Sequence, residues 1–339
     1  LLQSFSEEEM GSFMTTNFIQ ISWKLSVKEA MKELVKQAGE HDNISTIYVV
    51  DDQEIFYGAI DLKDLILARE GADLSSVAMT SYPYVYAHET IDDCISRIKN
   101  YSEDSIPVLD MENRLLGVIT AEDFMEVIDE EMGEDYAKLG GLSSEEDLKE
   151  ALSVSIKKRL PWLIILLGLG LGVSSVVGIF ESVAAQLTIV VCFQSLVLDM
   201  AGNVGTQSLA VTIRVLMDEK LSGLQKLSLI WKETKVGFIN GILLALLSLG
   251  MIGLYTWIFK GKDLFFAFAV AGCVGAALLL SMTLAAFAGT VIPVFFKKIN
   301  IDPAVASGPL ITTVNDLAAV VAYYGLAWIF LIQVLHLAG

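Results

Sequence analysis

Cysteine and histidine are scarce in this sequence, and neither occurs at the spacing of a metal site. Two of the three cysteines lie inside apolar runs, so we interpret all three as small hydrophobic residues, which excludes a disulfide framework and a zinc-type site. A nucleophile–base set and a phosphate-cradling glycine motif are also missing, which argues against an enzyme. The residues concerned are Cys94, Cys192, Cys273, His41, His88 and His336.

The N-terminus has neither an initiating methionine nor the basic-then-apolar run of a signal peptide. Residues 1–12 read like the tail of something longer. We therefore expect them to be the remnant of an upstream N-terminal domain.

Basic residues are rare in the first part of the chain, and acidic residues are rare in the second. Residues 1–150 hold 33 acidic and 11 basic side chains, whereas residues 151–339 hold 8 and 12. This asymmetry predicts two domains in different solvents, an acidic soluble one and an apolar membrane one. Because an acidic module repels nucleic acid and attracts cations, we expect no nucleic-acid partner.

The soluble part contains an internal repeat. Residues 47–66 read IYVVDDQEIFYGAIDLKDLI, and residues 106–125 read IPVLDMENRLLGVITAEDFM. Each copy predicts a strand, an acidic turn, a second strand entered through glycine and then a helix, and an amphipathic helix precedes each copy at 27–37 and 91–101. A shift of 59 residues aligns Asp51 with Asp110, Gly58 with Gly117, and Asp64 with Asp123.

This repeat resembles a pair of cystathionine-β-synthase (CBS) domains over residues 13–133. The pieces Gly58–Asp64 and Gly117–Asp123 match the nucleotide-facing signature of that fold. The resemblance implies a regulatory module that can bind an adenosine nucleotide such as ATP through Asp123 and the preceding Thr120. The first copy has Asp61 where the second has Thr120, so only the second copy carries both residues of the signature. A CBS pair that binds no nucleotide is the alternative.

Residues 134–160 form a polar connector that we predict to be helical. Ser143 offers an N-cap with acidic residues behind it, and the basic run at 157–159 suits the far end of a helix dipole. Such a helix could transmit motion to the membrane domain or act only as a tether.

The membrane part, residues 161–339, contains five apolar stretches long enough to span a bilayer. They cover residues 161–180, 184–217, 236–259, 264–296 and 309–335. With the basic run at 157–159 in the cytoplasm, ten bases fall inside and only Lys260 and Lys262 fall outside, as the positive-inside rule favours. We expect a multi-pass plasma-membrane protein whose soluble part is cytoplasmic.

Acidic groups within these stretches are informative, because a lone charge in the bilayer costs at least ~2.5–3.5 kcal/mol. Asp316 lies in the last stretch, with no basic residue nearby in the same span. We favour a pore-lining role for it over an interhelical hydrogen bond. Asp302 would share its helical face if one helix ran through Pro303 and Pro309, and an Asp-Pro helix cap is the alternative.

The second stretch contains Asp199 and Asn203 among glycines. Gly202 and Gly205 predict a broken helix, which a membrane tolerates only around protein or a water-filled cavity. Close helix packing through small residues is the competing interpretation. Glu181, at the outer end of the first stretch, is interpreted as a solvated terminus. An oxygen-only set of ligands selects hard cations such as Mg²⁺.

The order of CBS pair, connector and five spans resembles the MgtE family of magnesium channels. The matching text is Pro161-Trp162, residues 180–182 (FES), residues 201–208 (AGNVGTQS), and Asp302-Pro303-Ala304 through Ser307-Gly308-Pro309 to Asp316. The resemblance implies a multi-domain fold: a cytoplasmic α+β tandem CBS module of βαββα repeats, a connecting helix and an all-α five-helix membrane domain, in a homodimer. It also implies a pore lined by the second and fifth spans. Asp316 would be the central carboxylate, with Gly202, Asn203, Gly308 and Thr312 beside it and Asp302 at the cytoplasmic mouth.

The same resemblance implies regulatory Mg²⁺ bound by acids of the CBS pair and connector. Their positions are Asp92, Asp123, Glu126, Glu131, Glu134 and Asp135, whereas Ser102 stands where a family member can carry an acid. The expected function is Mg²⁺-selective uptake that intracellular Mg²⁺ shuts off. The alternatives are a CBS-regulated transporter of Mn²⁺ or Co²⁺, a cation-coupled Mg²⁺ exporter, a chloride pathway and a sensor that conducts nothing. Acidic intramembrane charges count against chloride.

Overall fold

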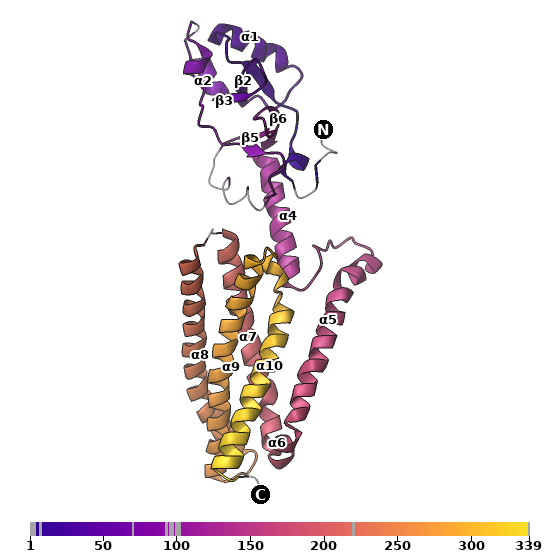
Figure 1. The fold of residues 1–339 in the computed structure, drawn as a ribbon, viewed down its shortest axis with the longest axis vertical. Helices are drawn as coiled ribbons and strands as arrows, with labels where there is room; N and C mark the ends of the chain where they lie inside the picture. The colour runs from indigo at the N-terminus through magenta and orange to yellow at the C-terminus, as the bar shows by residue number, and fades with distance from the viewer. Residues whose placement is uncertain are drawn as a thin grey trace. The chain divides into compact units, whose positions relative to one another are not determined.

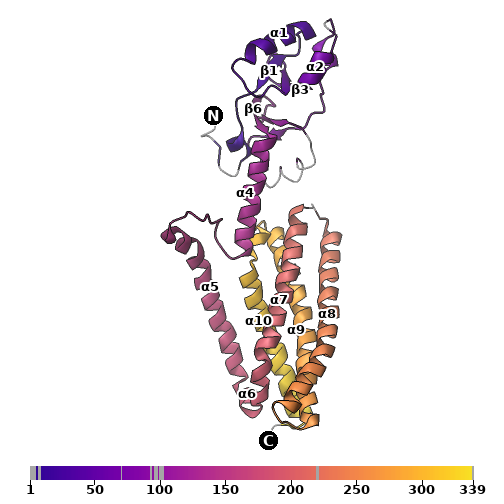
Figure 2. The same cartoon turned by 180° about the vertical axis from the view of Figure 1, so that it is seen from behind.

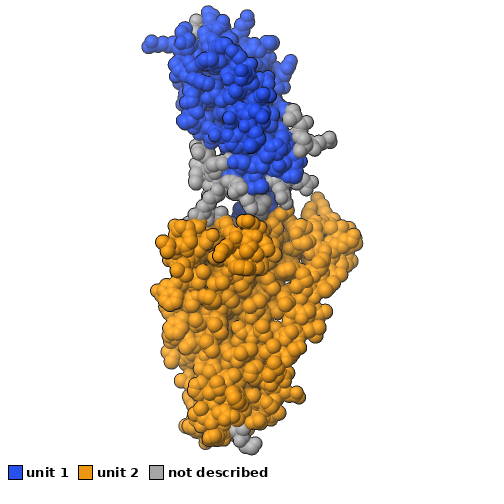
Figure 3. Space-filling model, in the orientation of Figure 1, with its two compact units in different colours: residues 1–132 blue, residues 133–339 orange. Residues whose placement is uncertain are grey.

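The computed structural model describes residues 5–6, 9–69, 71–91, 94, 98, 103–218 and 221–337, and only the backbone at residues 131, 217 and 218. The chain divides into two compact units, residues 1–132 and residues 133–339 (Figure 3). The first unit combines strands and helices, and the second is helical.

The first repeat of unit 1 forms a three-stranded sheet in the order β1-β2-β3, and its strands are labelled in Figures 1 and 2. Strand β1 (Ile19–Ser22) runs parallel to β2 (Thr46–Val50), which pairs antiparallel with β3 (Phe56–Asp61). Helix α1 (Val27–Gln37) connects β1 to β2 and has the predicted bounds, and α2 (Leu62–Leu67) follows β3. Helix α1 begins where it does because Ser26 and Glu29 form a capping box.

The second repeat forms an equivalent sheet in the order β4-β5-β6. Its elements are β4 (Val85–Tyr86), β5 (Ser105–Leu109), β6 (Leu115–Thr120) and α4 (Ala121–Leu139), while the short 3-10 helices η2 (Met10–Phe13) and η3 (Leu74–Ser76) precede the two repeats. In both acidic turns the Oδ1 atom of the aspartate, Asp51 or Asp110, accepts two backbone N–H bonds of 2.8–3.0 Å. The helix predicted at 91–101 lies largely outside the described residues.

Each repeat contributes its leading segment to the sheet of the other repeat. Thr15 bridges to β6, and Met79 bridges to β3. A methyl group on Gly117 would lie 2.9 Å from the carbonyl oxygen of Thr15, and one on Gly58 would lie 2.7 Å from that of Met79. The two glycines that mark the repeat in the sequence are therefore needed for this close approach of backbone to backbone.

The described part of the second unit contains five helices long and apolar enough to cross a membrane, as predicted. They are α5 (Leu152–Ile179), α7 (Thr188–Asp218), α8 (Gly223–Ile258), α9 (Leu264–Lys298) and α10 (Gly308–Leu326), which the π-helix η5 (Ala327–Val334) extends. The short helix α6 (Glu181–Gln186) joins α5 to α7, and the 3-10 helix η4 (Pro303–Val305) precedes α10.

Helix α9 is the centre of this bundle, with α7, α8 and α10 packed around it (Figure 2). Half of its most apolar window is buried, whereas none of the corresponding window of α5 is. In both ribbon views α5 lies at the edge of the bundle, where it contacts α10 (Figures 1 and 2). A long apolar helix in this position requires lipid or another protein surface to cover it.

The prediction of one connecting helix over 134–160 is wrong. Residues 134–139 finish α4, residues 140–151 form no helix, and residues 152–160 begin α5. Helix α4 is followed by Gly140-Gly141, and Gly141 adopts a φ of +82°, which glycine tolerates without strain.

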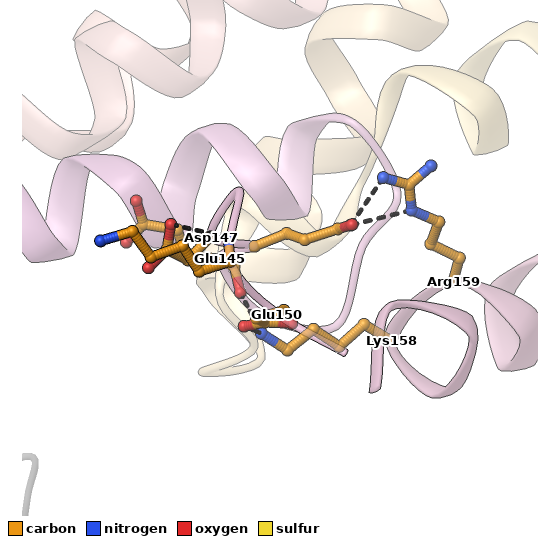
Figure 4. A network of polar contacts seen from close by, with 7 residues as sticks. Glu145, Asp147, Glu150, Lys158 and Arg159 are labelled. Carbon is orange, nitrogen blue, oxygen red and sulfur yellow. Dashed lines mark hydrogen bonds and ion pairs between the residues drawn. The ribbon is translucent and has the colours of Figure 1, made fainter. Parts of the chain in front are cut away.

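The basic run lies in the first turns of α5 instead of closing a connector helix. There Lys158 pairs with Glu150, and Arg159 pairs with Glu146 at 2.6 Å. Figure 4 shows Lys158 and Arg159 reaching back to the segment before α5. Hydrogen bonds from Ser155 and then from Arg159 lower the pKa of Glu146. These pairs tie the non-helical segment to the start of the first span.

Candidate functional site

One face of α7 carries polar side chains at four-residue intervals. Ser195, Asp199, Asn203 and Gln207 lie on this face, and all four are exposed on the protomer. Nδ2 of Asn203 donates a hydrogen bond to Oδ2 of Asp199 at 3.3 Å. At ~1.5 Å rise per residue, Asp199 lies roughly 17 Å from the first residue of α7. We call these four residues the α7 polar stripe; at this depth they require a protein or aqueous partner.

Helix α10 brings Asp316 to the same region. Asp316 is half-buried and lies about 12 Å along α10 from its first residue. Thr312, one helical turn before it, packs against Gly202 of α7, where a methyl group would lie 3.1 Å from Cγ2 of Thr312. Thr312 and Gly308 precede Asp316 at four-residue intervals, and Oγ1 of Thr312 donates to the carbonyl oxygen of Gly308 at 2.9 Å. Three predicted pore residues therefore share one line on α10.

The glycines of α7 serve packing against α10. Helix α7 is continuous through Gly202 and Gly205, so the prediction of a broken helix is wrong and the close-packing interpretation is confirmed. A methyl group on Gly202 would lie 3.1 Å from Cγ2 of Thr312, and one on Gly205 would overlap the amide of Asn315. Without side chains at these positions the two helices approach closely.

Asp302 does not share a helix with Asp316. Helix α10 begins only at Gly308, and Asp302 caps η4 by accepting a hydrogen bond on Oδ1 from the Ala304 amide at 2.8 Å. The cap interpretation is confirmed and the shared face is wrong, because a proline following a cap residue starts a helical turn more readily than it continues one. The second carboxylate oxygen, Oδ2, lies 2.9 Å from Nζ of Lys138 on α4.

Among the predicted regulatory acids that the structure describes, no cluster is formed. Across the described part of the chain no group of three or more Asp, Glu, His or Cys side chains could hold a metal ion. On α4, Glu126 and Glu134 are exposed, Asp135 is half-buried, and Glu134 lies 3.5 Å from Lys138. Asp92, Ser102 and the side chain of Glu131 lie outside what the structure describes.

Thr120 and Asp123, the predicted nucleotide pair, bond to each other. Oγ1 of Thr120 donates to Oδ2 of Asp123 at 2.7 Å and accepts from the Asp123 amide at 3.1 Å, at the start of α4. A cavity of about 130 Å³ beside Thr120 is smaller than the ~300–1,000 Å³ of typical small-molecule sites. A larger hollow of about 570 Å³ is lined by Asp61, Glu103 and Asp104 among others. Its three acids outnumber the one base of the lining, Lys63, and this net negative charge disfavours phosphate groups.

Two polar residues of α8 escaped the sequence reasoning. Glu233 on α8 is only 6% exposed and lies 3.3 Å from Oγ of Ser208 on α7. Asn240 faces a hollow of about 680 Å³ that Asn203 and Gln207 also line. In the sequence Glu233 stands between Lys232 and Lys235, so the sequence predicts an aqueous loop there. The pattern that could have identified it as buried is its spacing of four or eight residues from Leu229, Gly237 and Gly241, all buried on α8.

Family models match both parts of the chain. A model described as CBS domain matches residues 10–71 and 74–130, and a model named MgtE and described as divalent cation transporter matches residues 194–326. Together with the five spans, these matches define the class: a multi-pass membrane transporter of divalent cations that carries a pair of CBS domains.

Curated relatives extend the similarity to nearly the whole chain. The magnesium transporter MgtE of Enterococcus faecalis is 35% identical over 97% of this chain and 71% of its own length. Those of Bacillus subtilis and Thermus thermophilus are 31% and 29% identical, over 98% and 97% of this chain and 71% and 72% of theirs. The chain therefore belongs to the MgtE family, whose members are transporters and not enzymes.

Two solved structures are similar to part of the chain. The soluble part of a magnesium transporter is 32% identical, with a TM-score of 0.37, over 38% of this chain and 51% of that chain. The cytosolic domain of the Mg²⁺ channel MgtE in complex with ATP is 28% identical, with a TM-score of 0.36, over 37% of this chain and 51% of that chain.

Proposed function

We propose that the chain is one protomer of a homodimeric channel that conducts Mg²⁺ into the cell and that intracellular Mg²⁺ closes. The ion would pass between two copies of α7 and α10, beside Asp316. Asp302 would lie at the cytoplasmic end, because α10 starts on the side where α5 starts.

The observation that carries this proposal is the exposure of the α7 polar stripe. An unpartnered charge in lipid costs at least ~2.5–3.5 kcal/mol, so Asp199 and Asp316 need an aqueous or protein environment. A second copy related by two-fold symmetry would present the same stripe to the first and enclose it. The apolar helix α5, none of whose window is buried, offers further surface for such a partner.

The chemistry of the stripe favours a hydrated hard cation. Carboxylate and amide oxygens come from three residues of the stripe, Asp199, Asn203 and Gln207, and from Asp316 on α10, without sulfur or imidazole. Mg²⁺ loses water reluctantly and is commonly held by one or two carboxylates through several retained waters. A pathway with few carboxylates and room for water therefore suits Mg²⁺ better than a soft transition metal.

Closure would follow from the acidic soluble part. Residues 1–150 hold three times as many acidic as basic side chains, so two copies repel each other. Mg²⁺ ions bound by acids such as Asp92, Asp123, Glu126, Glu131, Glu134 and Asp135 would cancel that repulsion. If the compact state binds these ions better, Mg²⁺ shifts the population towards it.

A nucleotide at the second repeat is a subsidiary proposal. The Thr120–Asp123 pair has the residue types that the CBS signature requires, and binding would need their mutual hydrogen bond to open. Titration of the full chain with ATP by calorimetry tests this, with Asp123→Asn as the variant expected to lose the signal.

The test of the proposed function is ion flux into sealed vesicles. Wild-type protein should carry Mg²⁺, and Asp316→Ala should abolish flux while the protein still elutes as a folded dimer. Glu181→Ala is the matched control, since Glu181 is an exposed acid outside the five spans. Flux that survives Asp316→Ala overturns the site. Parallel assays with Mn²⁺, Co²⁺ and Cl⁻, and with an opposing Na⁺ gradient, separate the alternatives.

A further inference from the structure

The last turn of α4 belongs to the core of the membrane unit. Ala137 is 6% exposed, and Leu139 packs against a cluster formed by Leu209, Ile213, Ala306 and Ile311 of α7, the segment after η4 and α10. The turn is therefore held by apolar contacts. Lys138, between these two residues, has its backbone fixed on both sides.

Lys138 forms an ion pair with the carboxylate of Asp302. Its Nζ lies 2.9 Å from Oδ2 of Asp302 and 3.5 Å from a carboxylate oxygen of Glu134. The other oxygen of Asp302 accepts the Ala304 amide, so both oxygens are engaged. The Lys138 side chain is 24% exposed and that of Asp302 is 36% exposed, which limits screening of the pair by water.

A lysine side chain is positively charged at neutral pH. The ammonium group of Lys138, at the end of a four-carbon stem, contacts the one acidic residue among the described residues of the α9–α10 connection, Asp302.

The surroundings keep this cation next to the first turn of α10. A methyl group on Gly308 would lie 3.4 Å from the carbonyl oxygen of Leu139. The side chain of Trp162 closes over Gly141, and its Nε1 donates to Oγ of Ser307 at 2.9 Å. The end of α4 and the turn after it are thus fitted to the residues that start the helix of Asp316.

We propose that Lys138 is a tethered cation that occupies the carboxylate of Asp302 and competes there with the transported ion. A hydrated divalent cation reaches Asp302 only after the ammonium group has left it. This inference rests on the proposed function, since it assumes that ions pass Asp302. Through this competition Lys138 would set the Mg²⁺ concentration at which Asp302 binds the ion.

A purely structural role for Lys138 makes a different prediction. A lysine in the last turn of a helix also stabilises that helix through its dipole, and the ion pair could simply latch α4 to the membrane unit. Loss of a latch changes how many channels are open, and so the maximal flux. Loss of a competitor changes the Mg²⁺ concentration that gives half-maximal flux.

The experiment compares variants of the full chain in sealed vesicles over a range of Mg²⁺ concentrations. Lys138→Met removes the charge and keeps most of the stem. It should lower the half-saturating concentration several-fold, and Lys138→Arg should return it towards the wild-type value. Lys149→Met, at an exposed lysine, is the matched control. Lys138→Gln replaces Lys138→Met if the latter does not fold.

The Asp302→Asn background separates competition from a latch. Adding Lys138→Met to Asp302→Asn should cause no further shift, because the contested carboxylate is already gone. A change in maximal flux alone, or shifts that simply add in the double variant, would overturn the role of Lys138. Wild-type vesicles that carry no Mg²⁺ would instead overturn the proposed function, so the two failures are distinguishable.

Discussion

At the scale of single residues, the position of α7 in the bundle depends on Gly205, which is enclosed from two sides. Asn315 of α10 occupies the space where a side chain would be. On the other side Gly289 of α9 lies so close that its own methyl group would overlap the carbonyl oxygen of Gly205. Neither neighbour can retreat easily, because Asn315 is 1% exposed and the other contact is backbone.

We predict that Gly205→Ala destabilises the membrane unit. The added methyl group overpacks a closed contact, which typically costs ~1–3 kcal/mol. Thermal unfolding in detergent should show a lower midpoint than wild type. The additional substitution Asn315→Ala should recover part of the loss, since it removes the overlapping amide.

Gly250→Ala is the control for this prediction. Gly250 lies on α8 with no atom near the place of a side chain. Alanine there should be neutral or stabilising, by up to ~1 kcal/mol, because it restricts the unfolded chain. If both substitutions lowered the unfolding midpoint equally, the destabilisation would come from replacing any glycine within a helix, and the close contact at Gly205 would not be its cause.

At the scale of elements, α1 is held at its start by a local network. Oε2 of Glu29 accepts hydrogen bonds from the amide of Ser26 at 3.0 Å and from its hydroxyl at 2.7 Å. These bonds, the backbone one first, lower the pKa of Glu29. Because the folded-state pKa is depressed, the contribution is present above the unfolded value of ~4.3 and is lost as the pH falls.

Ser26→Ala should loosen the first turn of α1. Loss of such a cap typically costs ~0.5–2 kcal/mol, so amide hydrogen exchange at residues 27–30 should accelerate. In wild type, the protection of these amides should weaken as the pH falls below about 4. Glu29→Gln should remove that pH dependence. Exchange rates in Ser26→Ala that match wild type would mean that tertiary packing alone fixes the helix start.

At the scale of the whole molecule, the excess of acid in residues 1–150 predicts a response to Mg²⁺. Millimolar Mg²⁺ should slow limited proteolysis of the soluble part, because bound cations offset repulsion between carboxylates. Joint neutralisation of Glu126, Glu131, Glu134 and Asp135 to Gln or Asn should remove this effect and leave flux open at high Mg²⁺.

The control neutralises four exposed acids elsewhere in unit 1, namely Glu40, Asp42, Glu54 and Glu112. It removes the same net charge, so a general charge effect would change proteolysis equally in both variants. Retention of the Mg²⁺ response in the control alone would assign the regulatory ions to α4.

The sequence by itself determined the features that depend on local pattern. The 59-residue repeat, the bounds of α1 and the number of spans follow from periodicity and from runs of apolar residues, which hold wherever the chain lies. Asp316 could be singled out for the same reason, since a carboxylate within an apolar run is visible without coordinates. The resemblance to the MgtE family also rested on short continuous segments of sequence, such as residues 201–208.

The tertiary structure decided which distant residues meet. Glycines in α7 fit either a broken helix or close packing, and only the neighbouring α10, with Asn315 against Gly205, distinguished them. Lys138 and Asp302 are 164 residues apart, and Ser208 and Glu233 lie on different helices. Such pairs are formed by packing between helices, and no local pattern encodes packing because it depends on the shapes of both surfaces.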